Sequence, residues 1–297
     1  MIYVLIITTG VLIFAAAAGS AWITAGLAVA VALYALLRRR RTRSPERKLG
    51  VTDGAAAVQL TLLAWQLASG NFALADRMLF PPPEKVLRLF WAELPDMWSG
   101  LLSSLFLLGS GYLLALAAAI PAGVAVGYST RINAAGTPFI KVLSAIPPIV
   151  YIPYAIALLP SFSAASIFVI FVGAFWPVLV NTIHGVRQIA PEIVDSAKML
   201  HLTKRAFFLR VILPGAMPSI CTGATLGLVL GFLLLTAAEL IGATEGLGWY
   251  VKNFSDFADY DRVIVGIIFI GIVVTAVTFF TDRIERRLLR YREVAHD

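Results

Sequence analysis

The sequence AASIFVIFVGAFWPVLVNT, residues 164–182, decides the fold class of this chain. It contains no charged residue, and its apolar character is continuous rather than alternating. About 20 apolar residues are enough for a helix to cross the hydrocarbon core of a bilayer, whereas a strand of a membrane barrel alternates apolar and polar side chains. The stretch therefore predicts a transmembrane helix and disfavours a β-barrel.

The composition of the whole chain agrees with this prediction. Of the 297 residues, 59% are hydrophobic and only 14% are charged, and the mean hydropathy is +0.85. A soluble domain would carry about a quarter charged residues. The sequence predicts an all-α polytopic membrane protein with a core of five spans, at residues 101–128, 137–159, 164–182, 218–241 and 263–281.

The chain before this core is predicted to form an N-terminal extension of two to three helices. Residues 2–37 are apolar almost throughout and are read as two short helices that turn at Gly19-Ser20, with one long tilted helix as the alternative. The basic block at 38–48 is predicted to anchor the chain in the cytoplasm rather than to bind nucleic acid. We predict a domain boundary here, with a membrane hairpin and basic linker at 1–53 and a permease domain at 54–297.

Two further elements lie between this block and the core. Residues 55–74 are predicted to form another span. Three prolines at 81–83 then open an amphipathic stretch at 85–98, which is predicted to be an interfacial elbow rather than a span.

The distribution of basic residues predicts the orientation of the chain. With eight spans and both termini in the cytoplasm, 19 of the 24 Lys and Arg residues fall on the cytoplasmic side. Basic residues accumulate in cytoplasmic loops of membrane proteins, which supports this topology. Merging the first two helices into one span leaves every later segment on the same side.

The longest predicted cytoplasmic loop reads IHGVRQIAPEIVDSAKMLHLTKRAFFLRVILPGAM, residues 183–217. Pro191 suits the first turn of a helix, and Thr203 suits the N-cap of a second helix that is predicted to run to Arg210 and to stop at Pro214. The loop also carries apolar residues within a basic rim. An apolar surface outside the membrane suits docking to another protein, and the alternative is a hairpin lying on the membrane surface.

This loop resembles the "EAA" loop of bacterial ABC importer permeases, which is Glu-Ala-Ala, three residues, Gly, about nine residues, an aliphatic residue and Leu-Pro. The spacing agrees, while Asp195 replaces Glu, Ser196 replaces the first Ala and His201 replaces Gly. The resemblance implies that the loop couples the chain to a separate ATPase subunit. The predicted coupling residues are Asp195, Ser196, Ala197, Leu200, His201, Phe208, Leu213 and Pro214.

The substitution at His201 has a structural consequence. Gly is favoured at this place because helices commonly end on a left-handed residue, which other residues adopt at a cost of about 1 kcal/mol. Histidine is among the more tolerant alternatives. The helix–turn–helix is therefore expected to persist with an altered turn, and the substitution leaves open which partner the loop prefers.

Motifs elsewhere resemble the permeases of aliphatic sulfonate, taurine and nitrate importers, over about residues 80–291. They are FPPP with VL at 80–87, AIPP with YIP at 145–153, FWP with NT and GVR at 175–187, and AEL with GLG at 238–248. The resemblance implies a MetI-like permease core in the bacterial inner membrane. It also implies a homodimer, two copies of an ATPase that uses ATP and Mg²⁺, and a periplasmic or lipid-anchored binding protein that delivers a small solute.

The chain itself is predicted to be no enzyme and to bind no cofactor, metal or nucleic acid. It lacks the phosphate-binding pattern G-x-x-x-x-G-K-[ST], its single cysteine excludes a disulfide within the chain, and its three histidines have no metal-ligand spacing. A self-contained secondary carrier and a membrane-embedded enzyme are the alternatives. Few ionisable residues lie in the predicted core spans, which disfavours a proton-coupled carrier.

Four residues are candidates for the translocation path. Pro147 and Pro148 are predicted to break a membrane helix, either for a path or as packing kinks. Asn181 could line the inner end of the path, although a bond to a neighbouring helix is the favoured reading. Glu239, near a span end, is read first as a snorkelling or capping group and second as part of the path.

Overall fold

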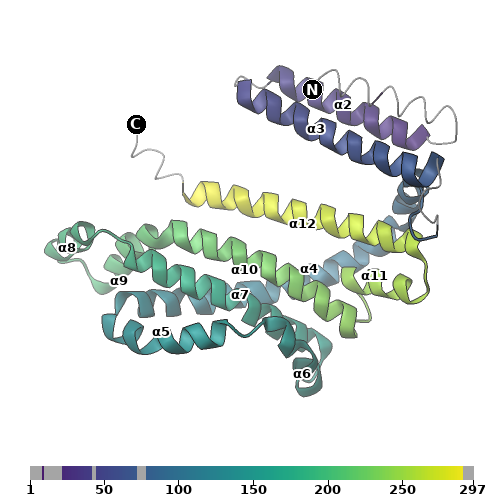
Figure 1. The fold of residues 1–297 in the computed structure, drawn as a ribbon. Coiled ribbons are helices and arrows are strands. Elements are labelled where there is room, and N and C mark those ends of the chain that lie inside the picture. The colour runs from purple at the N-terminus through teal and green to yellow at the C-terminus, as the bar shows by residue number, and fades with distance from the viewer. Residues whose placement is uncertain (1–8, 10–21, 42–44, 72–77, 290–297) are drawn as a thin grey trace. The chain divides into compact units, whose positions relative to one another are not determined.

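The computed structural model describes residue 9 and residues 22–41, 45–71 and 78–289, and every described element is helical. In order, the helices are α2 (Trp22–Arg41), α3 (Pro45–Trp65), α4 (Pro83–Tyr128), α5 (Thr130–Ser144), α6 (Tyr151–Leu158), α7 (Phe162–Arg187), α8 (Pro191–Met199), α9 (Lys204–Phe207), α10 (Leu213–Gly242), α11 (Leu247–Asp256) and α12 (Tyr260–Leu288) (Figure 1). Short π-helical turns follow α3 at Gln66–Asn71 and α9 at Phe208–Ile212, and a 3₁₀ turn at Pro148–Val150 precedes α6.

The predicted core of spans is confirmed. Four described helices are long and apolar enough to cross a membrane, namely α4, α7, α10 with its preceding turns, and α12. The fifth predicted span, 137–159, is a bent pair in which Thr130–Ser144 and Pro148–Leu158 meet at 63°. The prolines between them break the helix as predicted, because proline removes a backbone donor and clashes with the preceding turn.

Two boundaries differ from the predictions. The expected elbow at 85–98 and the span at 101–128 are one continuous helix, α4, of 46 residues. Pro83 begins it, as the prolines indicate, and the helix continues through Pro95 and Gly100 without a break after Trp98. The span expected at 55–74 corresponds to α3 and its π-helical turn. This helix is not among the described helices that are long and apolar enough to cross a membrane.

The chain divides into two compact units, Met1–Asp96 with Val251–Ile268, and Met97–Tyr250 with Phe269–Asp297. In the first unit, α2 and α3 pack through small residues, with Ala35 and Ala56 fully buried. Gln59 donates a buried hydrogen bond of 2.8 Å to the carbonyl of Ala28 across this pair. The predicted turn at Gly19-Ser20 lies outside the described residues. The predicted boundary after residue 53 falls within α3 and stays a prediction.

The second unit is centred on α7 and α10, which lie side by side (Figure 1). Glycine makes this contact close: a Cβ at Gly223 of α10 would lie 2.7 Å from the Cβ of Asn181 and 2.9 Å from the carbonyl oxygen of Pro177. A Cβ at Gly123 of α4 would similarly lie 2.6 Å from the Cβ of Thr182. Small residues that let helix backbones approach are typical of packing in membranes, where lipid is as apolar as the side chains.

Candidate functional site

The first helix of the loop at 183–217 begins as predicted. Pro191 occupies the first turn of α8, where its missing N–H needs no partner, and Glu192 lies in the same turn. The exposed carboxylate of Asp195 accepts a hydrogen bond of 3.0 Å from Lys198 one turn later. This bond raises the pKa of the Lys198 ammonium group.

The turn after α8 confirms the expected left-handed residue. His201 has φ of +48°, and its backbone N–H donates to the carbonyl of Lys198 at 3.0 Å. Its ring nitrogen Nδ1 lies 2.8 Å from the carbonyl oxygen of Met199, which can only accept, so Nδ1–H is the donor. The side chain thereby satisfies one of the carbonyls left free at the helix end.

The second helix starts as predicted but does not end as predicted. Thr203 is its N-cap, with Oγ1 accepting from the N–H of Ala206 at 3.3 Å. The prediction that Pro214 stops this helix is wrong. The chain passes through the π-helical turn at Phe208–Ile212 directly into α10, where Pro214 sits in the first turn. Proline has no N–H to donate to the preceding turn, and the wider π-helical turn before it lets the helix continue.

The loop folds into a hairpin whose buried residues pack together with residues of α4 and α10, and we name residues 183–217 the coupling hairpin after the role predicted for them. Ala197, Phe207 and Ile212 are buried in this core together with Val186 and Ala216, and Leu213 packs against it. Phe208 also points inward, with its ring 5.1 Å from that of Tyr128 at the end of α4. The predicted coupling residues therefore divide into inward and outward sets.

The outward set gathers around the turn. Asp195, Ser196 and His201 are exposed, and Leu200 exposes 73% of its surface. Exposed apolar side chains accompany it, with Met199 at 78% and Leu202 at 37%. Exposed basic side chains surround these residues: Lys198, Lys204, Arg205 and Arg210. Pro214 lies elsewhere, lining a cleft of about 380 Å³ between the ends of α7 and α10.

The four candidate path residues do not form one cluster of contacts. Pro147 precedes the 3₁₀ turn in the bent pair, and Pro148 opens it. Asn181 donates to the carbonyl of Pro177 in its own helix at 2.8 Å, so the expected bond to a neighbouring helix is not the one that forms. A role of these residues in the path stays a prediction.

Glu239 is a buried cap rather than a snorkelling group. The residue is only 1% exposed, and its two carboxyl oxygens accept hydrogen bonds from different partners. Oε1 accepts from the hydroxyl of Ser104 on α4 at 2.5 Å, and Oε2 accepts from the N–H of Gly248 in the first turn of α11 at 2.6 Å. The Ser104 hydroxyl in turn accepts from the N–H of Leu247 at 2.9 Å. One carboxyl group thus joins α4, α10 and the N-terminus of α11.

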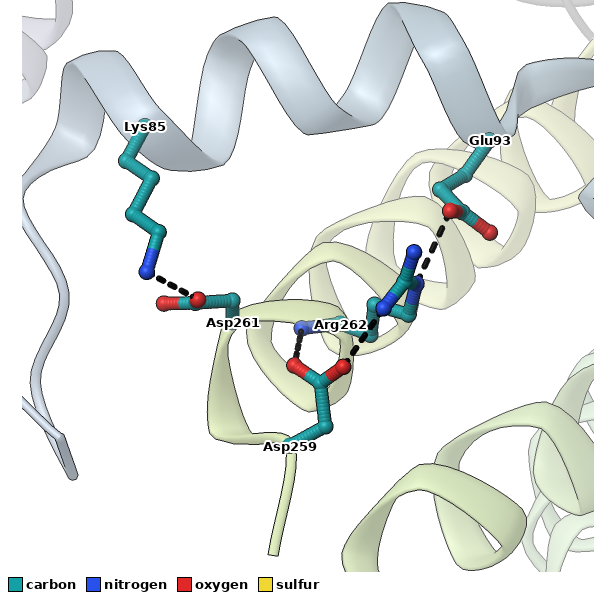
Figure 2. A network of polar contacts seen from close by, with 5 residues as sticks. All are labelled: Lys85, Glu93, Asp259, Asp261 and Arg262. Atoms are coloured by element: carbon teal, nitrogen blue, oxygen red, sulfur yellow. Dashed lines mark hydrogen bonds and ion pairs between the residues drawn. The ribbon is translucent and has the colours of Figure 1, made fainter. Parts of the chain in front are cut away.

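A second polar network joins the first part of α4 to the start of α12 (Figure 2). Arg262 donates to Glu93 at 2.8 Å and to Asp259 at 2.6 Å, while Lys85 pairs with Asp261. The sequence analysis missed this network. The spacing of Asp259 and Arg262 is a local signal for an ion pair, but Glu93 lies 169 residues away and no local pattern indicates it.

No group of three His, Cys, Asp or Glu residues that could hold a metal ion occurs among the described residues. The long apolar helices and the broken span define a helical membrane protein. The chain belongs to the family of binding-protein-dependent transport system inner membrane components, whose model matches residues 111–290. It is a multi-pass permease of ABC-type importers in the bacterial inner membrane, and the predicted family is confirmed.

The chain is similar to several curated permeases. It is 31% identical over 256 residues to the nitrate import permease protein NrtB of Leptolyngbya laminosa, covering 79% of this chain and 90% of that protein. It is 31% identical over 259 residues to the taurine transport system permease protein TauC of Escherichia coli, covering 84% and 93%. The putative aliphatic sulfonates permease SsuC of Bacillus subtilis is 26% identical over 254 residues, covering 85% and 92%.

Among solved structures, the inward-facing MetNI methionine ABC transporter contains a chain that matches with a TM-score of 0.57 and 18% identity. The match covers 66% of this chain and 98% of the other. It confirms the predicted MetI-like fold.

Proposed function

We propose that this chain forms the solute path of its importer and that the coupling hairpin is the surface on which a separate ATPase docks. The exposed apolar tip of the hairpin carries this proposal. Met199 and Leu200 expose 78% and 73% of their surfaces on a turn that belongs to none of the long apolar helices. Exposed apolar side chains rimmed by charge outside a membrane are typical of protein interfaces.

The fold of the hairpin supports a rigid docking element. Phe207 is buried, Phe208 packs on Tyr128, and Ala197 fills the space between the two short helices. These inward residues hold the tip in one conformation, so binding a partner costs little ordering entropy. The continuous path from α9 through the π-helical turn into α10 joins the tip to a core helix.

The solute class is inferred from the relatives. Their names state import of nitrate and transport of taurine, bicarbonate and aliphatic sulfonates. We infer a small anion or organic solute of the sulfonate, taurine, nitrate, bicarbonate or vitamin-precursor class. A periplasmic or lipid-anchored binding protein would deliver it, two copies of this chain would enclose the path, and two ATPase subunits would use ATP and Mg²⁺.

The docking assignment is tested by Leu200→Asp, with Phe257→Asp as the matched control. The exposed fraction of Phe257, 77%, is similar to that of Leu200. Phe257 lies between α11 and α12, on the predicted outer side. Truncating a central interface residue often costs about 2 kcal/mol, which weakens binding by about 30-fold. We expect Leu200→Asp to leave a normally inserted permease that loses the co-expressed ATPase on purification, while Phe257→Asp retains it.

Two outcomes would contradict the proposal. If Leu200→Asp retains its full complement of ATPase and transports normally, the hairpin is an element of the membrane surface and not the docking site. If the chain alone, reconstituted in liposomes, takes up solute along an ion gradient, it is a secondary carrier.

A further inference from the structure

A long apolar groove lies within the second unit, apart from the coupling hairpin. It encloses about 590 Å³ between α4, α10 and α12. Its lining runs from Val277 to Leu288 on α12, which at 1.5 Å per residue is about 16 Å, close to the thickness of one leaflet of hydrocarbon at about 15 Å. All three helices are long and apolar enough to cross a membrane, and the groove lies along them.

The chemistry of the lining excludes a polar solute. Leucine, isoleucine and phenylalanine dominate, as at Leu116, Leu228 and Phe280. The polar groups bond within the protein: the Tyr112 hydroxyl donates to the carbonyl of Ala224 at 3.0 Å, and Thr225 donates to Glu285 at 3.4 Å. A small anion would leave its hydration shell here without replacement bonds, whereas hydrocarbon would fill the space and regain dispersion contacts.

Basic residues flank one end of the groove without lining it. Leu288 ends the lining on α12, and the exposed arginines Arg283, Arg286 and Arg287 lie within the same last turns. None of the three forms an ion pair within the described part of the chain. Asp282 and Glu285 are the acidic residues of this stretch, and the carboxylate of Glu285 is turned to Thr225 on α10.

A second element adds basic charge to this end. Arg210 is exposed three residues before Leu213, the first lining residue of α10. The predicted topology puts this end in the cytoplasm, where anionic headgroups attract basic segments next to membrane spans.

We propose that this groove binds an acyl chain of an anionic phospholipid from the cytoplasmic leaflet, whose phosphate is held by the arginines at the end of α12. The groove has about the length of a leaflet and an apolar lining, and it is flanked, on the side where the headgroup would lie, by arginines that form no ion pair with any described residue. The inference goes beyond the proposed function and does not depend on ATPase docking.

The chain offers a matched pair of variants for the test. Gly109 lines the groove, and a Cβ built on it meets no atom within 4 Å, so Gly109→Leu fills the groove without a clash. Gly271 of α12 has the same open surroundings but does not line the groove. Gly271→Leu therefore controls for adding a leucine to a membrane helix.

The full-length chain is reconstituted in phosphatidylcholine vesicles with a trace of photoactivatable phosphatidylglycerol or, in parallel, photoactivatable phosphatidylcholine. After illumination, labelled peptides are mapped by mass spectrometry. We expect the phosphatidylglycerol probe to label residues 105–120, 213–228 and 277–288 more strongly than the phosphatidylcholine probe does. Gly109→Leu should lose most of this labelling and Gly271→Leu should keep it. Changing Arg283, Arg286 and Arg287 together to Gln should abolish the preference for phosphatidylglycerol.

Three results would overturn the proposal. The first is labelling of exposed positions outside the groove, such as Leu102 and Ile272, as strong as that of the groove. The second is labelling that Gly109→Leu leaves unchanged. The third is that the groove shows no lipid labelling and instead forms cross-links to a second copy or to residues 1–71. That result would show that protein covers the groove.

Discussion

Two neighbouring serines make the same hydrogen bond in different surroundings and allow a quantitative prediction. The hydroxyl of Ser104 donates to buried Glu239 at 2.5 Å, and the hydroxyl of Ser103 donates to exposed Glu245 at 2.9 Å. Both bonds join α4 to the end of α10 or the turn after it. Ser104→Ala and Ser103→Ala therefore remove the same atom from adjacent positions and differ mainly in burial.

The expected costs follow from what each change leaves behind. Ser104→Ala takes a donor from Glu239 and the acceptor from the N–H of Leu247, which is itself buried. Each unsatisfied buried group costs about 1–3 kcal/mol, so we expect a loss of about 3 kcal/mol in the free energy of unfolding. In Ser103→Ala water replaces the hydroxyl, and the loss should be below about 0.5 kcal/mol.

The measurement is equilibrium unfolding in mixed micelles, together with hydrogen exchange at the amide of Leu247. A loss of about 3 kcal/mol corresponds to roughly a 150-fold change in the unfolding equilibrium. Exchange at Leu247 should accelerate in Ser104→Ala and stay unchanged in Ser103→Ala. Equal destabilisation by the two variants, or a loss below about 1 kcal/mol for Ser104→Ala, would refute the assignment of Glu239 as a buried cap.

Three further outcomes are expected. His201→Gly should match or exceed wild-type stability, because it removes about 1 kcal/mol of left-handed strain, while His201→Val should lower the melting temperature. Phe208→Asp should prevent stable folding, seen as aggregation on size exclusion, because it places a charge against the core of the coupling hairpin; a normal monodisperse profile would contradict this packing. Arg262→Leu should cost about 1–2 kcal/mol through its bonds with Glu93, against below about 0.5 kcal/mol for exposed Lys252→Leu, and equal losses in the same unfolding assay would disprove the network.

Local signals predicted the parts of the structure that local physics determines. The apolar run at 164–182 lies within α7, Pro191 begins α8 and Thr203 caps α9, because each depends on residues within one or two turns. The left-handed conformation of His201 followed from its place at a helix end. These features depend on the local sequence and not on the helices that pack around it.

Tertiary contacts could not be predicted in the same way. Glu239 near a span end resembles a snorkelling side chain until Ser104, 135 residues earlier, is known to lie beside it. Phe208 resembles an exposed docking residue until Tyr128 of α4 is placed against its ring. Pro214 indicates a helix end, and only the π-helical turn before it explains why the helix continues.

That unbroken passage has a mechanical consequence. From Lys204 to Gly242 the chain is one helical rod of 39 residues, or about 58 Å at the α-helical rise. Its ends are the coupling hairpin and the turn of α10 that carries Glu239. A rod of about 58 Å that pivots at one end by about 5° displaces the other end by about 5 Å, comparable to one helical turn. A small rotation imposed at the hairpin would thus be amplified along α10 and would reach the carboxyl group of Glu239, which holds α11.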